Sequence, residues 1–318
     1  MFLLEEALAT WVLEDYPYSV ITQEKLSEQI FLLFMSKSYK GQRISLIRKK
    51  YATHEDFNLY INRVERAGIL TKAGENKRSY LPQYSGHLSN IYFIKGKPEY
   101  SASEAICAVY PYGYISKINA MAWYGITDRI PKIIRYTTCT PSEWKANSLA
   151  DLDVGPSVPF DREHFIPKYP KNTDVFGESL IVSVEKNYVS PAEIRNSPLR
   201  VSPIGKTFID MLRNPDECGG IDHVLDVYLE NAERYLPAIL KELKHERSRK
   251  IDISRTGFVL QKIVGITHPQ LSEWQKESQK TRGSSKVLVP GEPFSSIYDE
   301  DWSLSLNAES AKKYGNRH

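Results

Sequence analysis

The segment that most restricts how this chain folds is the helical pattern HEDFNLYINRVERAG at residues 54–68. Its apolar side chains recur at intervals of three and four and therefore share one helix face: Phe57, Ile61 and Val64. Thr53 precedes the pattern as a cap, Asp56 occupies the third helical position, and Gly68 ends the helix. A helix with one apolar stripe requires a core to pack against, and the flanking segments are predicted to supply it.

Those flanking segments predict two more helices and a hairpin. Amphipathic helices are expected at residues 2–15 and 23–34, on the N-terminal side of the first pattern. On its C-terminal side a strand begins at 69–70, a turn follows, and a returning strand covers 78–81. Two helices, a longer helix and a hairpin with a charged tip are the order of a winged helix. We therefore predict a winged helix-turn-helix domain at residues 1–86.

The rest of the chain completes a predicted α+β fold with two further regions. Residues 87–200 are expected to form a mixed α/β region, with strands at 91–95, 132–138 and 179–185, short helices from Ser103 and Ser116, and a long loop with some strand content at 147–173. Residues 201–318 are expected to be helical as far as 264, with strands at 286–289 and 302–307. In this last region Pro237 is expected to open a helix, and Asp252 or Ser254 to cap another.

Composition excludes several classes of protein. The 42 basic and 39 acidic residues leave a formal net charge of only +3, so a nucleic-acid interface would have to come from local charge. The three cysteines are far apart in sequence, which argues against a disulfide framework or a structural zinc site and favours the cytoplasm. No apolar run approaches the length of about 18 residues that spans a membrane, and the first residues lack the features of a signal peptide.

The strongest indication of function is a basic window before the predicted third helix. Residues 29–54 contain no acidic side chain. Basic residues of this window and of the predicted hairpin are expected to contact phosphates: Arg43, Arg48, Lys49, Lys50, Lys72, Lys77 and Arg78. Opposite the apolar stripe, a row at i, i+4 and i+8 is expected to read bases: His54, Asn58 and Asn62. The alternative interpretation of the same residues is a solvated charged face on a small helical domain.

Enzyme signatures are weak. SPIGKT at 202–207 is similar to the end of a phosphate-binding loop, but Arg200 stands where that loop requires glycine. Lys206 and Thr207 are therefore expected in the first turn of a helix. We predict no catalytic residue, no metal site and no cofactor, and hence no enzyme. Two alternatives stay open: a protein-interaction adaptor, and a nucleic-acid-processing enzyme that would hold a metal with acids such as Asp174, Glu185, Asp210 and Asp216.

Two longer segments resemble a known family. Residues 105–138, AICAVYPYGYISKINAMAWYGITDRIPKIIRYTT, are similar to the central signature of the AbiEi-type antitoxins, with matches at Tyr114, Ile115, Ser116, Ala120, Ala122, Tyr124, Gly125, Ile126 and Thr127. Residues 202–230 resemble the family's second signature, with matches at Ser202, Lys206, Thr207, Asp210, Pro215, Cys218, Gly219 and Gly220. Segments 255–265 and 301–307 are similar to a later helix and to the closing strand, so order and spacing agree over about residues 100–307.

The resemblance implies a transcriptional autorepressor and antitoxin, encoded beside a nucleotidyltransferase toxin in a phage-defence module of the abortive-infection type. Its N-terminal domain is expected to bind promoter DNA, and its C-terminal region to counteract the toxin, without necessarily forming a stable complex. The chain lacks the toxin's own motif, since no suitable acidic pair follows Gly283-Ser284. The stretch 35–52, between the second and third predicted helices, departs from the family pattern as an insertion. Promoter DNA and a cognate toxin are therefore the expected partners.

Overall fold

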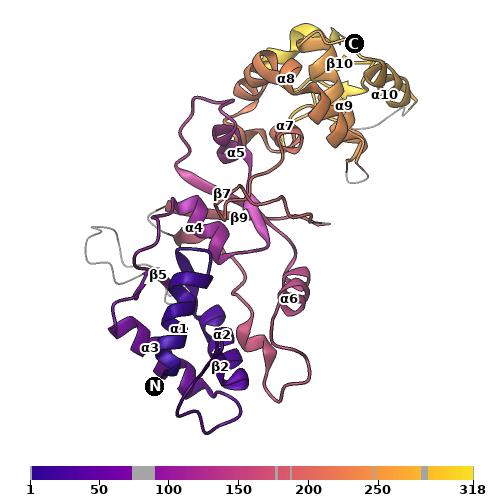
Figure 1. Cartoon of the computed structure of the whole chain (residues 1–318). Coiled ribbons are helices and arrows are strands. Elements are labelled where there is room, and N and C mark those ends of the chain that lie inside the picture. The colour runs from indigo at the N-terminus through magenta and orange to yellow at the C-terminus, as the bar shows by residue number, and fades with distance from the viewer. Residues whose placement is uncertain are drawn as a thin grey trace. The chain divides into compact units, whose positions relative to one another are not determined.

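The computed structural model describes residues 2–73, 90–175, 178–186, 188–245, 248–280 and 286–317. The chain divides into two compact units, whose elements are traced in Figure 1. Unit 1 comprises 1–114 and 132–200, and unit 2 comprises 115–131 and 201–318. Helices and several small sheets place the fold in the mixed α+β class. Among the helices of the described residues, none is both long and apolar enough to cross a membrane.

The N-terminal part of unit 1 combines three helices with a small antiparallel sheet. Its elements are α1 (Leu4–Thr10), continued by a π-helical turn at Trp11–Asp15, β1 (Val20–Thr22), α2 (Gln23–Ser36), β2 (Ser38–Tyr39), β3 (Gln42–Arg43), α3 (His54–Arg66), β4 (Leu70–Lys72) and β5 (Ile91–Ile94). The sheet has the order β1-β5-β4, and Val20 and Thr71 both lie opposite Phe93. The three predicted helices are confirmed.

Strand β5 shows where the sequence prediction of this region was incomplete. Residues 91–95 were expected to form a strand of the middle region. They do form a strand, but it pairs with β1 and β4. The N-terminal sheet is therefore completed beyond residue 86, the predicted end of the first domain. The predicted returning strand at 78–81 lies outside the described residues.

The helix ends follow capping rules that were visible in the sequence. Thr22 Oγ1 accepts a hydrogen bond of 3.2 Å from the backbone N of Lys25 and so caps α2. The carboxylate of Asp56 accepts hydrogen bonds of 2.8 Å from both the backbone N and Oγ1 of Thr53 at the start of α3. The three helices bury their apolar faces in one core, in which Phe31 of α2 and Phe57 of α3 are almost inaccessible to solvent.

The remainder of unit 1 is built around a second, four-stranded sheet. Its elements are α4 (Ala102–Val109), β6 (Gly113–Ile115), β7 (Ile133–Thr138), α6 (Pro141–Ala150), a 3-10 helix at Arg162–Phe165, β8 (Thr173–Val175) and β9 (Glu178–Val184). The strand order is β6-β7-β9-β8, with β7 and β9 parallel. Buried Arg200 holds the end of this unit, because its guanidinium donates to the carbonyl oxygens of Cys107, Tyr110 and Gly113.

Helix α6 corrects the expectation for residues 147–173. The helix extends to Ala150, and residues 151–172 contain a 3-10 turn but no strand. A capping box starts α6, since the carboxylate of Glu143 accepts hydrogen bonds from the backbone N and Oγ1 of Thr140, at 2.9 and 2.7 Å. Pro141 occupies the first turn, where its missing N–H costs nothing. The sequence signal for this helix was therefore present at Thr140-Pro141.

Unit 2 is mainly helical. Its elements are α5 (Lys117–Trp123), α7 (Ile204–Arg213), a 3-10 turn at Pro215–Cys218, α8 (Ile221–Leu243), α9 (Lys250–Phe258) with a π-helical turn at Val259–Ile263, α10 (Pro269–Gln279), β10 (Ile297–Asp299), β11 (Leu304–Ser305), a 3-10 helix at Glu309–Tyr314 and β12 (Asn316–Arg317). The strands form a sheet of order β11-β10-β12. Trp302, Phe208 and Tyr228 are among the largest side chains of its core.

Three expectations for unit 2 were wrong in detail. Pro237 does not open a helix but lies inside α8. Pro237 is exposed, and so is Glu233, whose carbonyl loses its helical donor. Asp252 is not the cap of α9 but its third residue, where its carboxylate accepts a hydrogen bond from the backbone N of Arg249. Residues 286–289 contribute one bridge, from Val287 to Ser305, instead of a strand.

Candidate nucleic-acid interface

The outer face of α3 carries the two asparagines that the sequence predicted as base readers. Asn58 and Asn62 are both exposed and lie one helical turn apart. The opposite face is buried as predicted, with exposures of 1–2% for Phe57, Ile61 and Val64. The burial of one face fixes the direction of the other, so both amide side chains project from a firmly packed helix.

The segment that leads into α3 presents three basic residues to solvent: Arg48, Lys49 and Lys50. Lys49 Nζ lies 3.0 Å from Oδ2 of Asp56. Lys50 Nζ lies 5.1 Å from the ring centre of Tyr51. In the described part of the chain, the Arg48 guanidinium pairs with no carboxylate. Among the described residues, Arg48 is therefore the basic residue of this segment whose charge is least balanced by a neighbour.

Asp56 links the basic segment to the helix cap. Partial burial acts to raise the pKa of its carboxyl group, but hydrogen bonds from Thr53 and Lys49 outweigh burial and lower the pKa. The carboxylate stays ionised and holds the Lys49 side chain against the first turn of α3. The local positive charge before α3 is reduced accordingly.

The predicted insertion at 35–52 contains the β2–β3 hairpin, and Arg43 is exposed on its second strand. Lys40 and Gly41 form a two-residue turn with positive φ angles of 47° and 78°. Lys40 Nζ lies 2.8 Å from Glu14 Oε2 and 3.0 Å from Asp15 Oδ1. The window without acids in the sequence is thus partly neutralised in space by acids that precede it.

His54, the first of the three predicted base readers, is exposed like the asparagines and also contacts neighbouring rings. Its ring centre lies 4.4 Å from that of His164 and 5.5 Å from that of Phe160, both outside the N-terminal helices. Burial first, and the neighbouring His54 second, lower the pKa of His164, while Asp161 opposes them. His54 therefore contacts an aromatic cluster at the start of α3, and its role as a base reader stays a prediction.

Of the three basic residues predicted on the hairpin, Lys72 lies within the described part of the chain. Lys72 is half-buried at the end of β4. Lys77 and Arg78 lie outside the described residues. Their contribution to a phosphate contact stays a prediction.

Sequence reasoning missed two arginines of α3. Arg66 is exposed and continues the row of Asn58 and Asn62 by one more turn. Arg63 Nη1 lies 3.0 Å from Glu5 Oε1, and its guanidinium lies 5.3 Å from the ring centre of Tyr60. The spacing of four residues from Asn62 to Arg66 was the available signal. Arg66 extends the candidate interface toward the C-terminal end of the helix.

Within unit 2, residues 115–131 of the first segment that resembles an antitoxin signature contact the second segment. Thr127 Oγ1 lies 2.8 Å from His223 Nε2, and Arg129 Nη1 donates to the carbonyl oxygen of Gly219 at 2.8 Å. Tyr124 donates to the carbonyl oxygen of Ser202 at 3.0 Å. Segments about 80 to 100 residues apart in sequence are therefore joined by hydrogen bonds, and these motif residues hold the fold of unit 2.

Lys206 and Thr207 lie in the first turn of α7, as predicted. Lys206 is 4% exposed, and its Nζ lies 3.2 Å from the carboxylate of Asp210. Thr207 Oγ1 donates to the carbonyl oxygen of Pro203 at 3.1 Å. A Cβ atom on Gly205 would lie 2.3 Å from the carbonyl oxygen of Ala238, so this glycine permits close packing of α7 on α8. The residues of this segment therefore pack within the fold of unit 2.

The acids named for the enzyme alternative are divided between the units. Asp174 accepts a hydrogen bond of 2.6 Å from Ser179, and Glu185 accepts one of 2.6 Å from Tyr114, both in unit 1. Asp210 and Asp216 belong to unit 2. Among the described residues, no three His, Cys, Asp or Glu side chains are grouped so as to hold a metal ion. Nothing in this arrangement favours the metal-dependent alternative over the others.

Comparisons with known proteins add little. No family model matches the chain, and no curated protein matches it. Among solved structures, the chain is similar to the crystal structure of the RV2827C protein from Mycobacterium tuberculosis, with a TM-score of 0.43 and 11% sequence identity. The match covers 93% of this chain and 88% of that one. A likeness of this size assigns no function, so the functional argument rests on the residues themselves.

Proposed function

We propose that unit 1 binds DNA through α3 and that the chain is a transcriptional repressor. One observation carries this proposal: a helix with a fully buried inner face exposes Asn58 and Asn62 in one row, directly after a basic segment. Asparagine forms a bidentate pair with adenine in the major groove. We expect the exposed residues Arg48 and Lys50, which lie just before α3, to contact the phosphates that flank a groove-bound helix.

The order of elements supports a winged helix-turn-helix. Helix, strand, helix, a short hairpin, helix and a strand pair follow one another, and the sheet order is β1-β5-β4. In helix-turn-helix proteins the second helix of the motif enters the major groove, which corresponds here to α3. Lys72, at the end of β4, then lies in the first strand of the hairpin, and Lys77 and Arg78 follow it in sequence.

The family resemblance supports a second part of the proposal. We infer that the repressor also counteracts a nucleotidyltransferase toxin encoded beside it, in a cytoplasmic abortive-infection module, without a cofactor or a catalytic reaction of its own. Unit 2 holds the matched residues of both signatures except Tyr114, so we assign neutralisation to this unit. Co-expression with the product of the neighbouring gene tests this part: growth should be restored by the full chain and by a variant that no longer binds DNA.

The DNA-binding part is tested on the DNA upstream of the chain's own gene, against scrambled DNA, over a series of salt concentrations. We expect log affinity to fall linearly with log salt concentration, because phosphate contacts release counterions. Asn58→Ala and Asn62→Ala should each reduce the preference for the upstream DNA by about 1–3 kcal/mol and leave binding to scrambled DNA nearly unchanged. Lys77→Ala with Arg78→Ala should weaken binding to both.

Asn147→Ala provides the matched control, because Asn147 is an exposed asparagine on α6, away from the proposed interface. It should leave both affinities unchanged. The proposal fails if the chain binds upstream and scrambled DNA equally, or if the α3 variants behave like Asn147→Ala.

An adaptor function has one observation in its favour. Leu46 is 72% exposed in the segment before α3, and Leu59 is 45% exposed on α3 itself. Apolar side chains at these positions suit a protein partner as well as thymine methyl groups. The salt series separates the two functions, since an apolar protein contact would show little dependence on salt.

A further inference from the structure

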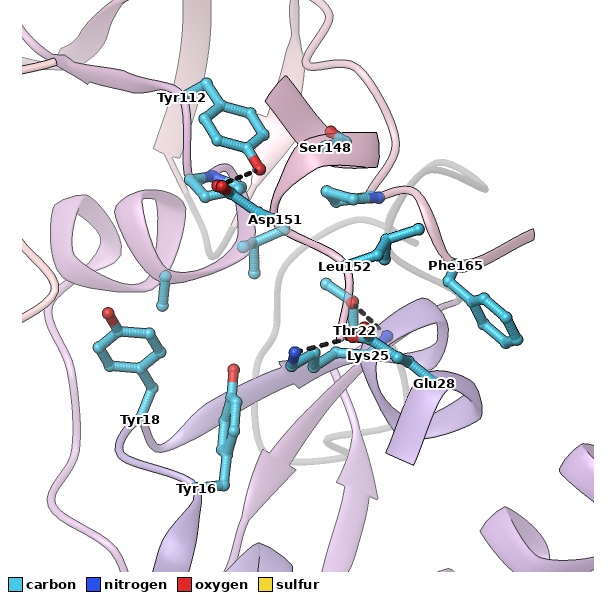
Figure 2. Close-up of a pocket in the computed structure, with 14 residues that line it drawn as sticks. Tyr16, Tyr18, Thr22, Lys25, Glu28, Tyr112, Ser148, Asp151, Leu152 and Phe165 are labelled. Atoms are coloured by element: carbon cyan, nitrogen blue, oxygen red, sulfur yellow. Dashed lines mark hydrogen bonds and ion pairs between the residues drawn. The ribbon is translucent and has the colours of Figure 1, made fainter. Parts of the chain in front are cut away.

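Unit 1 contains a cavity of about 210 Å³ at the N-terminal end of α2, next to the cap residue Thr22. Figure 2 shows its labelled lining: Tyr16, Tyr18, Tyr112 and Phe165 supply aromatic rings, and Lys25 and Glu28 reach it from α2. A cavity of about 150 Å³ accommodates benzene. This cavity therefore has room for one aromatic ring with a small substituent.

The tyrosine hydroxyl groups around the cavity already use their protons inside the protein. Tyr112 donates to Asp151 at 2.8 Å, Tyr18 donates to Glu193 at 2.8 Å, and Tyr16 donates to the carbonyl oxygen of Val20 at 3.0 Å. Each hydroxyl oxygen keeps acceptor capacity only. A ligand that fits these groups has to donate hydrogen bonds to them.

The charges around the cavity also favour a ligand that donates hydrogen bonds. Lys25 Nζ lies 2.7 Å from Glu28 Oε2 and 3.6 Å from Asp153 Oδ2, so its charge is balanced within the protein. The second oxygen of Glu28 accepts the backbone N of Asp153 at 2.8 Å. Asp151 is exposed and keeps one carboxylate oxygen beyond the bond from Tyr112. The cavity thus holds one paired cation and an additional carboxylate.

We propose that this cavity binds a small aromatic compound that carries a planar cationic donor group, such as an amidine or a guanidine. The ring lies among the tyrosines and Phe165, and the cationic group donates to Asp151 and to the tyrosine oxygens. An anionic compound of the same shape is rejected, because no basic side chain of the lining is left to pair with it.

The cavity is connected to α3 by aromatic contacts. The ring centre of Phe165 lies 5.4 Å from that of Phe31 on α2 and 5.9 Å from that of Phe57 on α3. His164, the next residue, stacks on Phe57 at 5.2 Å. A ligand against Phe165 therefore alters the cluster that supports the proposed DNA-binding helix. This second step rests on the proposed function for its biological meaning but not for its measurement.

The experiment titrates the full chain with benzamidine and with benzoate, two probes of nearly equal size and opposite charge, by NMR. We expect benzamidine to bind with a dissociation constant on the order of 1 mM, as suits a ligand of so few atoms. Benzoate should bind at least about tenfold more weakly. Asp151→Asn should remove this preference, and Ala108→Phe, which fills the cavity, should abolish binding of both.

Glu99→Gln is the control, because Glu99 is exposed and is not part of the lining. It should retain the preference for benzamidine. Equal binding of both probes, or affinity unchanged in both cavity variants, overturns the site. The link to α3 is read from the ring resonances of His54 and His164, without DNA. Shifts at saturating benzamidine support the link, and unchanged resonances overturn it while the site stands; failure of DNA binding affects only the proposed function.

Discussion

The outer face of α3 and the signature segments of unit 2 use their polar residues in opposite ways. On α3, Asn58 and Asn62 face solvent, and the helix is held by apolar burial on its other side. In unit 2, Thr127 and Arg129 bond to residues of the second signature, and Lys206 is buried beside Asp210. Polar groups that are exposed on a rigid element are available to a partner, whereas polar groups that are paired internally maintain the fold.

The charged pairs of the two regions also differ in their exposure to solvent. Lys49 and Asp56 form an ion pair near the surface, with the lysine side chain 56% exposed. Asp252 in unit 2 is 2% exposed and lies 2.7 Å from Arg213 Nη2 and 3.0 Å from Arg249 Nη2. An exposed pair contributes little to stability, whereas removal of one partner of a buried pair leaves an unpaired charge. Substitutions in the two regions should therefore separate stability from binding.

The largest effect is expected for Asp252→Asn. Loss of the carboxylate removes the charged partner that lies 2.7 Å from the Arg213 guanidinium. We expect the free energy of unfolding of unit 2, measured by denaturant titration, to fall by about 3–5 kcal/mol. Asp301→Asn is the control, since Asp301 pairs with Lys262 nearer the surface and should cost less than about 1 kcal/mol. Equal effects of the two substitutions would contradict the contrast between buried and exposed pairs.

The Asp252 prediction has a defined pH dependence. Burial acts to raise the pKa of Asp252, but the hydrogen bonds from Arg213 and Arg249 outweigh it and lower the pKa from 3.8 to about 2. Because the folded pKa is depressed, the stability is fully present above about pH 4 and is lost as the pH falls through about 2. The difference between wild type and Asp252→Asn should narrow over that interval.

Gly205→Ala tests whether the phosphate-loop-like segment is a packing device. Its Cβ would meet the carbonyl oxygen of Ala238 on α8 at 2.3 Å, so the helices must separate, at a cost of about 1–3 kcal/mol. Gly155→Ala in unit 1 meets nothing within 4 Å and should change stability by less than about 0.5 kcal/mol. Thermal unfolding of both variants checks this. If Gly205→Ala leaves the thermal stability unchanged, the packing argument fails and the segment is again a candidate for ligand binding.

The contrast between the regions also shows what the sequence predicts well. Caps and apolar stripes are local, so Thr22, Thr53 and the burial of Phe57 followed directly from spacing. The pairing of β5 with β1 did not follow, because it depends on contacts between residues about 70 positions apart. Pro237 was misassigned since a local rule for proline ignores whether the lost hydrogen bond faces water.

The candidate interface was predictable to a similar degree. The row of Asn58 and Asn62 is a property of one helix and could be read from its period. The contact of His54 with the ring of His164, and the pairing of Lys40 with Glu14 and Asp15, involve residues from other segments. Charge counted along a sequence window therefore overestimates the charge that is available in space.

Substitutions of Arg48 and Lys49 test whether internal pairing reduces the charge that the basic segment offers to DNA. Arg48→Ala removes a guanidinium that pairs with no carboxylate among the described residues, and should reduce the slope of log affinity against log salt by about 1. Lys49→Ala removes a charge already paired with Asp56, and should reduce the slope less. Filter binding to the upstream DNA measures both. If the two variants are indistinguishable, internal pairing does not govern the DNA contacts.

The smallest effect is expected from pH at the aromatic cluster beneath α3. The lowered pKa of His164, caused first by burial and then by His54, means that the folded chain resists protonation more than the unfolded chain does. Stability contributed by the neutral ring is therefore present above about pH 6.5 and declines as the pH falls through the depressed folded pKa. His164→Gln should flatten this decline in thermal unfolding between about pH 8 and 5.5. An unaltered slope in His164→Gln would place the acid sensitivity of the fold elsewhere.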